Sequence, residues 1–298
     1  MKTYNRRSFL TASALAGAAL VMPQSIWAMS ATRGQRYKVA VIDLMILKRQ
    51  KLSAIALTKE IGADGLEVDM GGLGNRDTFD NKFLDEAFRN EYLQAMKDQG
   101  VEIASVAMTG FYAQSFAERA TYKQMVGDCL KTCQLLGAKV AFLPLGVKGD
   151  LVLHPELRPA IVARLKEVGK MAKKAGVTVA IETALDARGD VELLNEIDSK
   201  HIQIYFNFSN PLKAGRDLVE ELEILGKKRI AQIHCTDEDG VWLENNTRLD
   251  MPKVKQALDR MGWKGWLVIE RSRDARIPTQ VKENFSANTR YVKSIFQS

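Results

Sequence analysis

The feature that most constrains this chain is a repeat in which an amphipathic stretch ends at a glycine and a short apolar run follows. The glycines at this position are Gly62, Gly100, Gly137, Gly176, Gly226 and Gly262. Glycine suits the left-handed residue that closes a helix. The runs after these glycines, such as VTVAIET, are rich in β-branched residues, as strands buried on both faces are. The chain is therefore expected to alternate helix and strand over most of its length.

Two more strand-like runs, YKVAVIDL near residue 40 and HIQIYFNF near residue 205, bring the expected number of strands to eight. The segments between them, for example LDEAFRNEYLQAMKDQ, carry apolar residues at the three and four spacing of amphipathic helices. Eight such units close a (β/α)8 TIM barrel, so we predict one α/β barrel domain over residues 37–298. A doubly wound open sheet is the alternative. It is disfavoured because no G-x-G-x-x-G follows the first strand and no linker divides the chain.

The N-terminus reads as an export signal. The stretch MKTYNRRSFLTASALAGAALVMPQSIWAMSA has basic residues, then a short run rich in Ala and Gly, and a plausible processing site near Ala28. The arginine pair followed by SFL resembles a twin-arginine (Tat) signal, whose machinery exports folded proteins. A general secretory peptide is the alternative. We expect residues 1–28 to be the signal and 29–36 a short connecting segment.

Export implies a location in the periplasm or outside the cell, with the Tat machinery as a partner. The apolar run is too short for a stable membrane span. The net charge is +7, and it falls to +4 without the three basic residues of the signal. Because no basic run remains, we expect no nucleic-acid partner. The three cysteines, Cys129, Cys133 and Cys235, are too scattered for a disulfide framework or a thiolate metal site and are expected to be core residues.

The residues at the carboxyl ends of the expected strands matter most, because TIM-barrel active sites lie there. In the second half of the chain these residues are Glu182, Asn207, His234 and Glu270. Each alone has an ordinary explanation, such as a helix cap, an Asx turn or a hydrogen-bonded core histidine. In a barrel, however, all four converge on one mouth, where two buried glutamates need a cation or a proton. We therefore predict that these four side chains bind a divalent ion.

Two carboxylates, an imidazole and an amide oxygen suit Mn²⁺, Mg²⁺ or Co²⁺, with Zn²⁺ as a further candidate. Such an ion would polarise the carbonyl of a hydroxy-ketone and ease removal of the neighbouring C–H proton. Glu182 and Glu270 are the predicted catalytic residues, one acting as base and the other as acid. The predicted chemistry moves a proton between carbons of a sugar.

The motifs GLEVD, AIET, IYFNFSNPL, IAQIHCTDEDG and GWLVIERSRD resemble the sugar phosphate isomerase/epimerase family of xylose isomerase-like TIM barrels. The resemblance runs from about residue 37 to the C-terminus. It implies kinship with ketose 3-epimerases, inosose dehydratases and endonuclease IV. It also implies a metal held by Glu, Asp, His and Glu, with the two glutamates exchanging protons on opposite faces of the substrate through an enediolate.

The chain departs from this family pattern at Asn207, where the family has aspartate. The replacement removes one negative charge from the implied ligand set, so the affinity for a divalent ion should fall. One interpretation is a weaker metal site that an anionic substrate completes. The other is a site that has changed to metal-independent chemistry or to binding.

Five further residues are expected to bind the substrate. Arg188 lies where the resemblance implies a substrate-contacting group, Arg271 follows Glu270, and Glu67 ends the second strand. Phe111, with Tyr112 next to it, and Trp242 lie on loops where aromatic faces could stack on a sugar.

We therefore predict an exported isomerase or epimerase acting on a keto-sugar or related carbohydrate. The alternatives are a non-catalytic carbohydrate-binding barrel and a lyase or dehydratase acting on keto-glycosides or inososes. A nuclease is opposed by the low basic charge and by the presence of only three histidines. Export favours a substrate that is not phosphorylated, or one that resembles a uronate. A homo-oligomer is left open.

Overall fold

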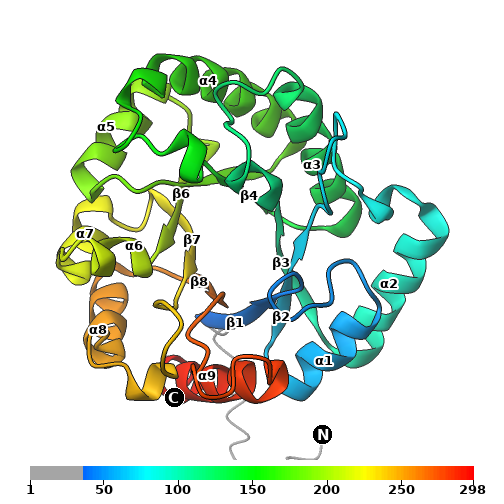
Figure 1. Cartoon of the computed structure of the whole chain (residues 1–298), viewed down its shortest axis with the longest axis vertical. Coiled ribbons are helices and arrows are strands. Elements are labelled where there is room, and N and C mark those ends of the chain that lie inside the picture. Colours follow the sequence, from blue (N-terminus) through cyan, green and yellow to red (C-terminus); the bar gives the residue numbers. More distant parts are fainter. Residues whose placement is uncertain (1–35) are drawn as a thin grey trace, which may run out of the picture. The chain divides into compact units, whose positions relative to one another are not determined.

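Eight parallel strands form a closed barrel in which each strand pairs with its neighbours in sequence order (Figure 1). The structure, a computed structural model, describes residues 36–298. The pairing of β1 with β8, from Tyr37 opposite Gly265 to Val41 opposite Ile269, closes the ring. The predicted (β/α)8 barrel is thus confirmed, whereas the predicted signal lies outside the described residues. The strands are β1 Tyr37–Ile42, β2 Gly65–Asp69, β3 Glu102–Ala107, β4 Val140–Pro144, β5 Thr178–Glu182, β6 Ile202–Asn207, β7 Ile230–His234 and β8 Gly265–Ile269.

The helices form an outer ring around the strands (Figure 1). The last helix, α9, packs against both α1 and α8 and completes that ring. The α-helices are α1 Ser53–Ile61, α2 Glu86–Gln99, α3 Tyr122–Leu136, α4 Arg158–Ala175, α5 Ala187–Ile197, α6 Ser209–Lys213, α7 Leu218–Leu225, α8 Met251–Met261 and α9 Val281–Phe296. Short 3-10 helices lie in the loops: η1 Lys82–Leu84, η2 Thr109–Tyr112, η3 Val147–Gly149, η4 Pro155–Leu157 and η5 Leu243–Asn245.

The glycines of the sequence repeat end helices as expected, with one variation. Five of them are left-handed residues directly after a helix: Gly62, Gly100, Gly137, Gly176 and Gly262. The sixth, Gly226, also has a positive φ of 66° but an extended ψ of 161°. That ψ directs the chain into a turn in which the Arg229 N–H donates to the Gly226 carbonyl, and β7 begins at the next residue.

The interior of the barrel combines small residues with a polar layer. Its apolar side chains are small or aromatic for the most part, and half of them are alanines. They are Ala40, Ile42, Ala104, Ala107, Phe142, Ala180, Tyr205 and Val268. The alanines leave room for long side chains from other strands, among them Glu67 and Gln232, which are fully buried. A second and larger apolar core lies between strands and helices and contains the three cysteines, which are free and buried as predicted.

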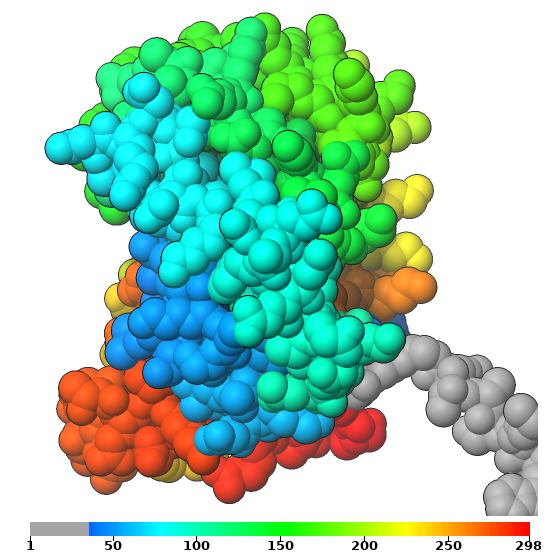
Figure 2. All heavy atoms as spheres, turned by 90° about the vertical axis from the view of Figure 1, so that its right-hand side faces the viewer, coloured from blue at the N-terminus to red at the C-terminus, as the bar shows by residue number. Residues whose placement is uncertain are grey.

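The loops after β2 and after β8 project from the same side of the molecule, where Figure 2 shows them in light blue and orange. That side bears the carboxyl ends of the parallel strands, because these loops follow directly from strands of the barrel. Within residues 36–298, no helix has both the length and the apolar character needed to cross a membrane.

Candidate functional site

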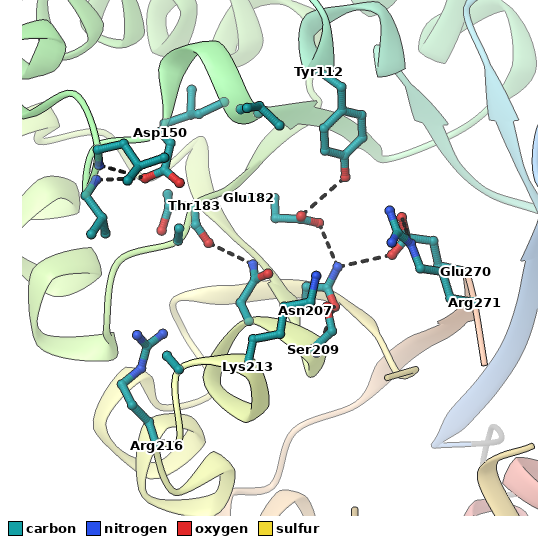
Figure 3. Close-up of a pocket in the computed structure, with 18 residues that line it drawn as sticks. Tyr112, Asp150, Glu182, Thr183, Asn207, Ser209, Lys213, Arg216, Glu270 and Arg271 are labelled. Carbon is teal, nitrogen blue, oxygen red and sulfur yellow. Dashed lines mark hydrogen bonds and ion pairs between the residues drawn. The ribbon is translucent and has the colours of Figure 1, made fainter. Parts of the chain in front are cut away.

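A cavity of about 520 Å³ opens at the carboxyl ends of the strands. Its floor is formed by Glu182 at the end of β5, Asn207 at the end of β6 and Glu270 directly after β8. Figure 3 shows these three side chains meeting at the centre, with Tyr112 on the opposite side of Glu182. The volume lies within the range of small-molecule sites, roughly 300–1,000 Å³.

The barrel brings the four strand-end residues of the sequence prediction together. His234 Nδ1 lies 3.1 Å from Glu182 Oε2 and 3.8 Å from Glu270 Oε2. Asn207 Nδ2 lies 3.3 Å from Glu182 Oε2 and 3.1 Å from Glu270 Oε2. The two carboxyl groups and Asn207 reach the cavity, whereas His234 is fully buried behind them.

Asn207 presents its amide nitrogen, and not its oxygen, to the two glutamates. Its Oδ1 accepts hydrogen bonds from the Ser209 backbone N–H at 3.0 Å and from the Ser209 hydroxyl at 2.9 Å. A backbone N–H can only donate, so it fixes which end of the amide faces Ser209. The NH₂ group is left to donate to Glu182 and Glu270.

Glu182 accepts three hydrogen bonds. Tyr112 donates its hydroxyl proton to Oε1 at 3.2 Å, and Asn207 and His234 contact Oε2. Burial, followed by the charges of Glu182 and Glu270, raises the pKa of Tyr112 well above its ordinary value. Tyr112 therefore stays a hydrogen-bond donor throughout the neutral range.

The surroundings of Glu270 differ from those of Glu182. Burial raises the pKa of Glu270, an effect that the positive charges of His234 and Arg271 oppose and that Glu182 reinforces. Asn207 is a donor to its Oε2, and Arg271 Nε lies 3.7 Å from its Oε1. Burial thus favours the protonated form of Glu270.

A buried polar layer supports His234 from below. Glu67 Oε2 accepts hydrogen bonds from Ser105 at 2.6 Å and Tyr205 at 2.7 Å, while its Oε1 lies 3.5 Å from His234 Nε2. Burial alone would lower the pKa of His234, but Glu270, Glu182 and Glu67 raise it to about 10. His234 is therefore an imidazolium at neutral pH, and its charge offsets part of the negative charge of the three glutamates.

The four residues do not fit a divalent ion as the sequence prediction supposed. Asn207 was expected to supply an oxygen ligand, but that oxygen faces Ser209 and the amide hydrogens face the centre. Across the described part of the chain, no three His, Cys, Asp or Glu side chains are arranged to hold a metal ion. The two glutamates are therefore arranged around a hydrogen-bonding NH₂ group and not around a cation.

The walls of the cavity differ in character. The lining includes three basic residues, Lys213, Arg216 and Arg271. Lys213 also pairs with Glu238 at 3.0 Å and Arg216 with Glu221 at 2.9 Å. The loop after β4 forms an apolar side that contains Val147, Val152 and Leu153, and these three side chains are 57–70% exposed. The cavity thus offers both positive groups and apolar surface.

Two of the residues expected to bind substrate lie below the cavity instead. Glu67 is fully buried in the polar layer under His234 and is not part of the cavity lining. Phe111 is fully buried too, with its ring packed edge-on against Phe79 and Phe116. Both expectations were wrong. β2 and η2 do lie near the mouth of the barrel, but the side chains of Glu67 and Phe111 point into the interior and not into the cavity.

Two others lie to the side. Trp242 donates its indole N–H to Asn284 of α9 at 2.8 Å, so a helix distant in sequence covers it. Arg188 is exposed in the first turn of α5 and lines a separate groove beside α7. Neither lines the central cavity, whereas Arg271 does, as expected.

The sequence prediction did not include Lys213 or Arg216, and it named Tyr112 only beside Phe111, as an aromatic that could stack on a sugar. Tyr112 directly follows Phe111 in η2. A 3-10 helix has three residues per turn, so neighbouring side chains point about 120° apart, and here one enters the core and the next enters the cavity. The only sequence signal that could have indicated Lys213 and Arg216 as lining residues is their position after the end of β6.

Comparisons with known proteins agree with this architecture. The model of a family described as "Xylose isomerase-like TIM barrel" matches residues 55–294. No curated protein sequence matches the chain.

Several solved structures share the fold. One is the 3-keto-D-glucoside 4-epimerase YcjR from E. coli, with a TM-score of 0.65 and 18% identity over 86% of this chain and 99% of that one. A second is D-psicose 3-epimerase from Clostridium cellulolyticum H10 with D-tagatose, with a TM-score of 0.68 and 13% identity over 87% and 99%. A third is the IolI protein with a bound zinc atom, with a TM-score of 0.66 and 15% identity over 87% and 98%. At these identities the likeness establishes the fold.

Proposed function

The chain belongs to the xylose isomerase-like TIM barrel family, and from this premise we propose that it is a carbohydrate isomerase or epimerase that moves a proton next to the carbonyl of a keto-sugar. Glu182 and Glu270 are the proposed acid–base pair. The observation that carries the proposal is their meeting on the floor of one cavity, joined through the Asn207 amide.

The two carboxyl groups suit different halves of a proton transfer. A general acid has to hold a proton near the working pH, and burial raises the pKa of Glu270 in that direction. Glu182, ordered by three donors, is the proposed base. Enolisation places negative charge on the carbonyl oxygen of the substrate. Arg271, in the cavity lining, is the proposed donor to that oxygen.

No step of the proposed reaction runs through a metal ion, because Asn207 turns a donor toward the centre. The cation that the sequence resemblance implied is therefore left out of the reaction proposed for this chain. The positive charges present are those of His234 behind the floor and of the basic side chains on the cavity wall.

The walls suit a sugar that has both oxygen-rich and less polar parts. Lys213 and Arg216 could bind hydroxyl or carboxylate oxygens, and Val152 and Leu153 offer apolar surface. The names of two structural neighbours, a 3-keto-glucoside epimerase and a psicose epimerase, support a keto-sugar as the reacting part. We propose a keto-glycoside or a uronate-like keto-sugar as the substrate class.

Deuterium incorporation tests the proposal. The protein would be incubated in D₂O with a panel of ketoses, keto-uronates and 3-keto-glycosides, and exchange followed by NMR. We expect uptake at a carbon next to the carbonyl, and a rate lower by about 100-fold or more in Glu182→Gln and Glu270→Gln. The exposed control Glu244→Gln should keep the full rate.

Absence of uptake from every member of the panel would contradict the proposal. Sugar binding without exchange would then favour the carbohydrate-binding alternative, and loss of water from the substrate would favour a lyase.

We also propose export to the periplasm or beyond by the Tat route. Support comes from the N-terminal sequence alone, with its arginine pair and its Ala-rich run.

A further inference from the structure

The inference concerns the amide of Asn207 and what it replaces. Asn207 is 5% exposed and lies between two carboxylates that are 8% and 4% exposed. Carboxylate oxygens buried this deeply need donors or a cation, since burial penalises their charged form.

The amide has two hydrogens, and the two nearest acceptors are one oxygen of each glutamate. Nδ2 lies 3.3 Å from Glu182 Oε2 and 3.1 Å from Glu270 Oε2 (Figure 3). Each carboxylate thus receives one N–H from the same nitrogen. The amide nitrogen is the atom that joins the two acids.

The orientation of the amide is fixed from outside the site. If the amide turned over, its NH₂ would face the Ser209 backbone N–H and its oxygen would face two carboxylate oxygens. The contact with the Ser209 backbone N–H would then pair two donors, and the contacts with the ionised glutamates would pair two acceptors; only the Ser209 hydroxyl could adapt, by accepting. The backbone N–H of Ser209 therefore holds the oxygen away from the centre, where a metal would require it.

We propose that the Asn207 NH₂ group stands in place of a divalent cation in this chain, bridging Glu182 and Glu270 so that the site is assembled without a metal. The proposal does not depend on the proposed isomerase activity, because it concerns only how the carboxylates are held.

The same geometry predicts what happens when the amide is replaced by a carboxylate. In Asn207→Asp, one oxygen would keep the two hydrogen bonds from Ser209. The other would lie next to the two glutamate oxygens, where the amide nitrogen is now. Three carboxylates with His234 beside them form a set that needs a cation, and more ligand charge raises the affinity for divalent ions. The variant should therefore gain a metal site.

The test measures metal and not turnover. Wild type and Asn207→Asp would be purified, treated with EDTA, and titrated with Mn²⁺ and with Zn²⁺ by calorimetry, with metal content and thermal midpoint recorded alongside. We expect wild type to show no saturable binding at this site and no EDTA-dependent change in midpoint. The variant should bind close to one equivalent, with an affinity at least about tenfold above the upper limit that the titration sets for wild type, and its midpoint should rise on metal addition.

A matched control tests whether added charge in the same loop is enough to create metal binding. Asn210→Asp introduces the same charge in the same loop, but Asn210 donates to the Thr183 carbonyl and does not bridge the glutamates. It should bind no more metal than wild type.

Stoichiometric metal in wild type, or a chelator-dependent midpoint in wild type, would overturn the proposal. An Asn207→Asp variant that folds but gains no affinity would overturn it as well. Should that variant fail to fold, the wild-type titration alone decides. These results are independent of whether any sugar is turned over.

Discussion

At the scale of single residues, the Tyr112 hydroxyl donates to Glu182 from the lining of the cavity. Tyr112→Phe removes this hydroxyl and keeps the ring that lies beside Phe142. The exchange rate should fall by about tenfold, the effect of one hydrogen bond to a charged group. Stability should change by less than about 1 kcal/mol, since the side chain is only partly buried.

Deuterium exchange and urea unfolding of Tyr112→Phe give the two numbers. Tyr291→Phe, which removes a hydroxyl on α9, is the control and should retain full exchange. An unchanged rate in Tyr112→Phe would show that this hydroxyl does not act on Glu182 or on the substrate.

His234 gives the protein a pH-dependent stability. Its folded pKa of about 10 lies above the ordinary value of 6.5, so its contribution is complete below pH 6.5 and is lost as the pH rises through 10. In that window the free energy of unfolding should fall by up to about 1.4 kcal/mol per pH unit.

Urea unfolding from pH 6 to pH 10 measures this slope. The His234→Gln variant should lack the His234 part of the slope, whereas His154→Gln, at a side chain that is 46% exposed, should retain it. Parallel curves for wild type and His234→Gln would contradict the imidazolium assignment.

At the scale of elements, η2 carries two aromatic residues in consecutive positions: Phe111 lies in the core and Tyr112 lines the cavity. Phe111 is fully buried between Phe79 and Phe116. Phe111→Ala should therefore destabilise the protein by about 3–5 kcal/mol. Val147→Ala, at a side chain 70% exposed, should change stability by less than about 0.5 kcal/mol. Equal effects in denaturant titrations would show that Phe111 is not the core residue described.

Some parts of the site could be predicted from the sequence and others could not. Helix–glycine–strand alternation is a local pattern, and closing the barrel necessarily gathers Glu182, Asn207, His234 and Glu270. The direction of a loop side chain depends on packing that the sequence does not display. Phe111 was therefore chosen in place of Tyr112, and the cover that α9 gives Trp242 could not be foreseen.

The orientation of Asn207 belongs to the same class of unpredictable features. The spacing Asn-x-Ser is visible in the sequence, but which end of the amide Ser209 holds depends on the backbone at the start of α6. The sequence located the centre of the site, and the three-dimensional contacts determined its chemistry.

At the scale of the whole molecule, the proposed export depends on the N-terminal arginine pair. Replacing Arg6 and Arg7 with lysine should leave the precursor in the cytoplasm, because the Tat machinery reads the arginine pair. Cell fractionation with immunoblotting measures the distribution. Undiminished export of the double variant would indicate a general secretory route.

Two glutamates bridged by an amide are proposed to move a proton on a keto-sugar without a divalent ion. Deuterium uptake from D₂O into 3-keto-glycosides and ketoses, measured with EDTA-treated protein, decides whether they do. We predict uptake next to the carbonyl at a rate that chelation leaves unchanged, and loss of that uptake in Glu182→Gln and Glu270→Gln. Uptake that disappears on chelation and returns with Mn²⁺, or no uptake from any of these sugars, would contradict it.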